Sequence, residues 1–62
     1  METTTNTAAA AILRWAEVTG QNVWDIPTAL EVELAEAVFA TNPHGPFVWE
    51  IREIIWEEVA AA

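Results

Sequence analysis

Apolar side chains recur at helical spacing in three stretches of the chain, and residues that stop helices separate these stretches. Positions three or four apart share one face of a helix, because a helix has about 3.6 residues per turn. We therefore predict an all-α fold, a small bundle of two to three helices at about residues 8–19, 28–40 and 46–60. Gly20 follows the first stretch, where glycine commonly ends a helix. The turn at 41–46, rich in Asn, Pro and Gly, makes the last two helices antiparallel neighbours.

Polar side chains mark where the predicted helices begin. Thr7 is a suitable N-cap for the first helix. Thr28 and Glu31 fit a capping box, in which each side chain binds a free backbone N–H at the start of a helix. The Thr/Asn-rich segment 1–7 has nothing to bury, so we expect a flexible arm ahead of a single helical domain at 8–62.

One face of each helix supplies the expected core. Its members are Ile12, Leu13, Leu30, Leu34, Val38, Phe47, Ile51, Ile54 and Ile55. The middle helix is apolar over a wide arc, which indicates that it is contacted on two sides. Glu31 falls inside that arc, and its capping role accounts for it. The linker before this helix carries an apolar anchor, Val23-Trp24.

The last predicted helix has a second apolar surface, opposite its core stripe. Trp49 and Trp56 are seven residues apart and so lie two turns from each other, with Arg52 between them at contact spacing. We name these three residues the ladder. A guanidinium over an exposed indole gains about 0.5–1 kcal/mol. Beside the ladder runs an acidic strip formed by Glu50, Glu53 and Glu57.

The ladder has two interpretations. In the first, its tryptophans pack against another helix of the same chain and the glutamates are only solvated. In the second, the ladder is the centre of a protein interface and the glutamates form its charged rim. Tryptophan and arginine are over-represented at interface centres. The candidate partner-binding residues are then Trp49, Arg52, Trp56, Glu50, Glu53 and Glu57.

The length of the chain limits the core that it can form. A chain of 62 residues is one domain at most, and folding at this size buries only about 60% of the unfolded surface. A lone core of this kind rarely supplies more than about 3–5 kcal/mol. The chain has no cysteine for disulfides, while its hydrophobic content is 53% and it has four tryptophans. We therefore expect oligomerisation or a partner protein to complete the bundle.

Charge narrows the choice of partners. Ten acidic and two basic side chains give a formal net charge of −8. Nucleic acids and anionic membranes are bound through Lys and Arg, so we predict neither as a partner. A charged protein partner should have a basic surface. Three explanations of the acidity stay open: solubility, the composition or salt adaptation of the source, and mimicry of nucleic-acid charge.

The chemistry of the sequence predicts a non-enzyme without cofactor or metal. His44, the single histidine, lies in a Pro/Gly turn, where histidines usually face solvent. Zinc sites need more histidine or cysteine ligands than this chain has. The glutamates of the strip could offer carboxylates to a cation, but the Glu-x-x-His motif of di-iron bundles is missing. We do not predict a helix-turn-helix DNA-binding protein, because the last predicted helix would be the recognition helix and it would present glutamates to the DNA.

The sequence favours a location in the cytoplasm. The N-terminus lacks the basic flank of a secretory signal, and the longest apolar run, Ala8 to Leu13, falls short of the roughly 20 residues of a bilayer span. Our first hypothesis is an acidic module that docks on a larger protein through the ladder as an inhibitor, adaptor or regulator. The alternative is a homo-oligomeric structural or assembly-accessory subunit. Size and charge give a general impression of phage or mobile-element accessory proteins, with no motif behind it.

Overall fold

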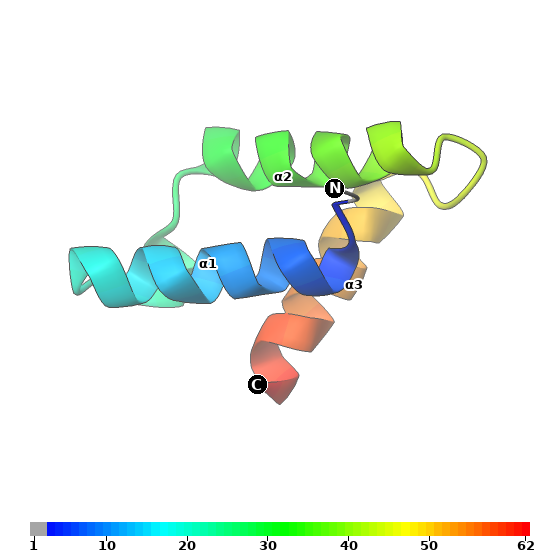
Figure 1. The fold of residues 1–62 in the computed structure, drawn as a ribbon. Helices are drawn as coiled ribbons and strands as arrows, with labels where there is room; N and C mark the ends of the chain where they lie inside the picture. The colour runs from blue at the N-terminus through cyan, green and yellow to red at the C-terminus, as the bar shows by residue number, and fades with distance from the viewer. Residues whose placement is uncertain (1–2) are drawn as a thin grey trace.

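The computed structural model describes residues 3–62, which form three α-helices and one 3-10 turn (Figure 1). Helix α1 comprises Thr5–Thr19, the turn η1 Val23–Asp25, α2 Thr28–Thr41 and α3 Val48–Ala61. The predicted all-α bundle is confirmed, and the ends of the second and third helices agree with the prediction to within two residues. None of the helices in this part of the chain combines the length and the hydropathy that a membrane crossing requires.

The third helix crosses the first two. Helices α1 and α2 lie side by side and run in opposite directions, and α3 passes behind both at a steep angle (Figure 1). The prediction that α2 and α3 are neighbours is confirmed, but their antiparallel arrangement is wrong. Both α1 and α2 offer an apolar face to α3, and a crossing helix contacts the two faces at once.

The core lies where α3 meets the other two helices. Its side chains below one tenth exposure are Ala8, Ala9, Ile12, Ile26, Ala35, Val38, Ile51, Ile55 and Val59. Four predicted core residues are therefore confirmed as buried: Ile12, Val38, Ile51 and Ile55. The predicted leucines and Ile54 are partly buried. Three alanines belong to the core because a small side chain lets the backbones approach closely.

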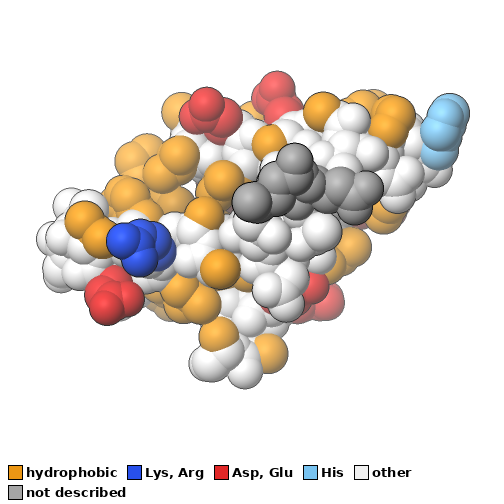
Figure 2. All heavy atoms as spheres, in the orientation of Figure 1, with side chains coloured by type: hydrophobic (Ala, Val, Ile, Leu, Met, Phe, Trp, Pro, Cys, Tyr) orange, Lys and Arg blue, Asp and Glu red, His pale blue; other side chains and the backbone are white. Residues whose placement is uncertain are grey.

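Phe47 was wrongly predicted as a core residue. It is 64% exposed, because it precedes α3 as the N-cap residue and so lies outside the buried helix face. Its ring packs edge-on against Phe39, with 5.6 Å between the ring centroids. Hydrophobic side chains also remain visible over α1 and α2 on the face opposite α3 (Figure 2). A chain of this size cannot cover all of its apolar surface.

The first helix begins earlier than predicted. Its N-cap is Thr4, whose hydroxyl accepts a hydrogen bond from the backbone N–H of Thr7 at 3.1 Å. Thr7 is therefore a residue of the first turn, and the predicted arm at 1–7 is shorter than expected. Residues 1–2 of that arm lie outside the described residues. At the other end, the C-cap Gly20 has the predicted left-handed conformation, with φ of 71°.

A glutamate at the end of α3 supports the start of α1. Thr5 Oγ1, in the first turn of α1, donates a hydrogen bond of 2.9 Å to Glu58 Oε1. The first turn of α1 has no acidic residue of its own, and the positive end of a helix dipole favours a nearby carboxylate. Glu58 is unfavourable for the dipole of its own helix but favourable for that of α1.

Candidate functional site

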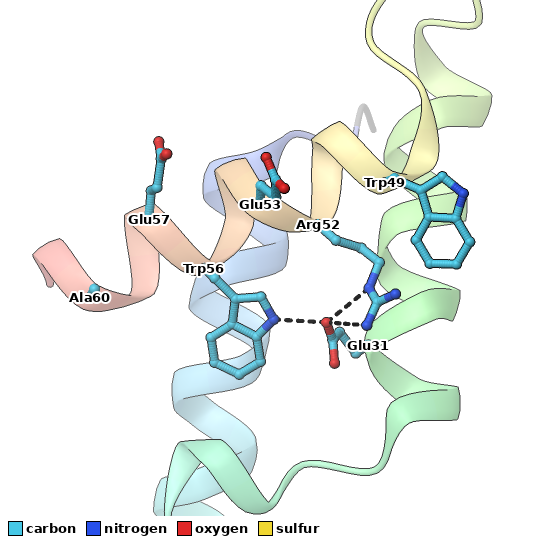
Figure 3. Close-up of a pocket in the computed structure, with 7 residues that line it drawn as sticks. All are labelled: Glu31, Trp49, Arg52, Glu53, Trp56, Glu57 and Ala60. Atoms are coloured by element: carbon cyan, nitrogen blue, oxygen red, sulfur yellow. Dashed lines mark hydrogen bonds and ion pairs between the residues drawn. The ribbon is translucent and has the colours of Figure 1, made fainter.

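The ladder on α3 meets a buried carboxylate from α2. Glu31 Oε1 accepts hydrogen bonds from Arg52 Nε at 2.9 Å and from Trp56 Nε1 at 2.7 Å (Figure 3). The Nη2 atom of Arg52 lies 2.9 Å from the same oxygen. Glu31 is only 8% exposed, and it joins the first turn of α2 to the middle of α3.

The capping box that was predicted for Glu31 is wrong. The N-cap of α2 is Pro27, and no side chain makes a capping hydrogen bond there. Arg52 and Trp56 offer Glu31 donors that include a cation, and charge-assisted hydrogen bonds of this kind are stronger than neutral ones. Glu31 still lies in the first turn of α2, where the helix dipole favours a carboxylate.

The two oxygens of the Glu31 carboxylate differ in their hydrogen bonds. A buried charge is costly unless it is paired and hydrogen-bonded, and Oε1 meets this need with its three N–H contacts. The other oxygen, Oε2, accepts no hydrogen bond from residues 3–62. It is not among the fully buried atoms that lack a partner, so it faces solvent. The site thus contains one open acceptor.

Trp24 extends the site beyond the ladder. Its ring stacks on that of Trp56, with 4.9 Å between centroids and 16° between planes. The turn η1 positions it, because Asn22 Oδ1 accepts a hydrogen bond of 3.2 Å from the Trp24 backbone N–H. Trp24 was predicted to be part of an apolar anchor, yet it is 67% exposed. Its hydrophobicity in a linker was the one available signal, and that signal did not indicate which indole it meets.

Trp49 occupies the other end of the ladder. The guanidinium carbon of Arg52 lies 5.1 Å from the centroid of the Trp49 ring, so the cation–π contact expected from their spacing is present. Trp49 is 64% exposed, whereas Trp56 is partly buried. The first interpretation of the ladder, packing within the chain, therefore describes Trp56 but not Trp49, which lies at the surface.

These side chains line an open groove of about 680 Å³ along α3. Its lining consists of Glu31, Trp49, Arg52, Glu53, Trp56, Glu57 and Ala60. Figure 3 shows the carboxylates of Glu53 and Glu57 directed away from Glu31. Neither has an ion-pair partner within residues 3–62. Glu50 is exposed but does not line the groove, so the predicted acidic strip contributes two of its three members.

The lining of the groove combines apolar and charged side chains. Its tryptophan, arginine, glutamate and alanine side chains supply apolar contact, hydrogen bonds and charge, and none is a hydroxyl or thiol nucleophile. His44 lies exposed in the turn between α2 and α3, outside the groove. Within residues 3–62, no three or more His, Cys, Asp and Glu side chains group as a metal site would require. Comparisons with protein-family models, with curated proteins and with solved structures gave no match for this chain.

Proposed function

We propose that this chain is a non-catalytic interaction module that docks on a larger protein through the groove along α3. The observation that carries the proposal is the exposure of Trp24 and Trp49, at 67% and 64%. They stand at the two ends of one series of contacts, which runs through Trp56, Glu31 and Arg52. The effect on the partner would be inhibition, adaptation or regulation, and we propose the cytoplasm as the location.

Covering the exposed indoles would contribute to the free energy of binding a partner. A fully buried aromatic side chain removes about 150–250 Å² from water, at roughly 25 cal/mol per Å². Covering the exposed two thirds of Trp24 or Trp49 would therefore stabilise a complex by roughly 2–4 kcal/mol each before the costs of association. Large apolar patches on a protein surface commonly mark interaction sites.

The centre of the groove is arranged before any partner arrives. The hydrogen bonds of Glu31 hold Arg52 and Trp56 in one geometry. Ordering a side chain on binding costs about 0.5–1.5 kcal/mol, and a side chain that is already fixed avoids most of this cost. A rigid Trp/Arg centre with exposed indoles beside it has the composition of an interface hot spot.

A self-associating structural subunit is the second candidate function. The exposure of Phe47 favours it, because this ring lies outside the groove and is 64% exposed. Two copies of the chain would repel each other through their net charge of −8. This repulsion is the reason that we rank self-association below docking on another protein.

Site-specific photo-cross-linking tests the proposal without altering the groove. A photoreactive phenylalanine analogue replaces Glu50, which is exposed beside Trp49, in the cells that produce the protein. The matched control carries the analogue at Glu33, an exposed position of α2 outside the groove. We expect a discrete adduct from position 50 alone, displaced by excess wild type but not by a Trp24→Ser/Trp49→Ser variant. Equal adducts from both positions, or none from position 50, would overturn the proposal.

A further inference from the structure

The groove has a net negative charge despite its arginine. Arg52 is neutralised by Glu31, whereas Glu53 and Glu57 have no ion-pair partner within residues 3–62. Salt screens exposed charges beyond about 8 Å at physiological ionic strength, so a partner in the groove interacts mainly with the charges that line it. A matching surface therefore carries cations opposite Glu53 and Glu57.

The groove runs along one face of α3. The lining residues that belong to α3 begin at Trp49 and end at Ala60. They recur at intervals of one to four residues along roughly 16 Å of the helix axis. A second helix repeats its own side chains at the same intervals and packs along such a surface. Strand addition, in which an extended segment pairs with a sheet edge, is not available, because residues 3–62 form no strand.

The open oxygen of Glu31 offers an acceptor to a partner. Glu31 lines the groove, and its Oε2 faces solvent without a hydrogen-bond partner within residues 3–62. A carboxylate oxygen only accepts hydrogen bonds, so a donor of the partner would take the place of solvent there. Lysine, arginine and the side-chain amides each supply such a donor.

We infer that the groove receives an amphipathic basic helix of a different protein. This inference rests on the proposed function and names the chemistry of the partner. Basic side chains of that helix pair with Glu53 and Glu57, its apolar side chains cover Trp49 and the Trp24–Trp56 stack, and a donor from it reaches Oε2 of Glu31. A second copy of the chain fits poorly, because it has two basic residues against ten acidic ones.

Designed peptides test the inference on the full chain. The probe is a synthetic peptide of about 18 residues, long enough to form a helix in water, with leucine on one face and lysine on the other. One control peptide has glutamate in place of lysine. A second has the leucine and lysine residues of the probe in a shuffled order without an apolar face. Titration calorimetry should show binding of the probe, at least about tenfold weaker binding of the shuffled peptide, and none of the glutamate peptide.

Two double variants that remove the same charge then distinguish the effect of the groove carboxylates on peptide binding from the effect of the net charge of the chain. Glu53→Gln/Glu57→Gln should weaken binding of the lysine probe by about three- to tenfold, since two exposed ion pairs are lost. Glu33→Gln/Glu36→Gln removes the same charge from exposed positions of α2 outside the groove and should weaken it less than about twofold. Circular dichroism verifies that both variants stay helical.

The possible failures are distinguishable. Equal weakening by the two double variants, equal binding of the lysine and glutamate peptides, or no binding of the lysine probe would each overturn the inference. A position-50 adduct that persists in such a case would retain the proposed function with a partner of different chemistry. Loss of that adduct would remove the proposed function itself.

Discussion

Replacing Glu31 by glutamine perturbs a buried contact that joins the predicted ladder to α2. The substitution keeps the shape of the side chain and removes its charge. Arg52 then lacks a carboxylate, and the hydrogen bonds from Arg52 and Trp56 end on a neutral amide oxygen, which is a weaker acceptor than the charged Oε1. The new amide NH₂ group takes the solvent-facing place of Oε2.

The expected loss of stability follows from the exposure of the two partners. A hydrogen bond to a charged group contributes about 1.5–3 kcal/mol, and removing one partner of a buried pair costs about 3–5 kcal/mol. The side chains of Arg52 and Glu31 are 24% and 11% exposed, so water takes over part of the lost interaction. We expect a loss of about 2–3 kcal/mol, which is large against the roughly 3–5 kcal/mol that a core of this size supplies. The midpoint of thermal unfolding should fall by roughly 10–20 °C.

The assay is thermal and urea unfolding followed by far-ultraviolet circular dichroism at one salt concentration. Glu33→Gln is the matched control, because it removes the same charge from an exposed position of α2 and should change stability by less than about 0.5 kcal/mol. Trp56→Phe isolates the indole N–H, since it keeps an aromatic ring for the stack, and should cost about 1 kcal/mol. A Glu31→Gln variant within about 0.5 kcal/mol of Glu33→Gln would refute the assigned role of Glu31.

Three further substitutions, one of them with a matched control, test other parts of the fold by the same unfolding measurement. Trp24→Leu should remove the stack on Trp56 and cost about 0.5–1.5 kcal/mol, with a change in near-ultraviolet circular dichroism; an unchanged spectrum would argue against the stack. Glu58→Gln should destabilise by about 1 kcal/mol because α1 loses its carboxylate, whereas Glu57→Gln should be neutral or slightly stabilising; effects of equal sign and size would contradict this assignment. Gly20→Ala should cost about 1 kcal/mol through its positive φ alone, since no atom lies within 4 Å of an added Cβ; a neutral result would contradict the left-handed C-cap.

The fold was predictable where local pattern determines it. Apolar spacing located all three helices within residues 3–62, and Gly20 marked an end that depends on backbone conformation alone. The start of α1 was missed because Thr4 and Thr7 are equally suitable caps by composition. The steep crossing of α3 was missed because it depends on which faces of α1 and α2 contact α3. The apolar spacing within a single helix does not determine that.

The candidate site was predictable on one helix and not across helices. The spacing of Trp49 and Arg52 on α3 was sufficient to predict their contact. Glu31 stood out as a carboxylate within an apolar arc, but a local capping motif offered a simpler explanation than a partner on α3. Trp24 lies in a short turn without periodicity, so no sequence rule connects it with Trp56. Contacts between distant elements depend on tertiary packing.

Molar mass in solution tests most directly whether the groove is open to another protein. Light scattering on a size-exclusion column, at low and at high salt, should give the mass of one chain in both buffers. A Trp49→Ser variant should have the same mass and remain folded, because Trp49 is 64% exposed in the single chain. A stable wild-type dimer or larger assembly that this substitution dissociates or unfolds would contradict the account, since a second copy would then fill the groove.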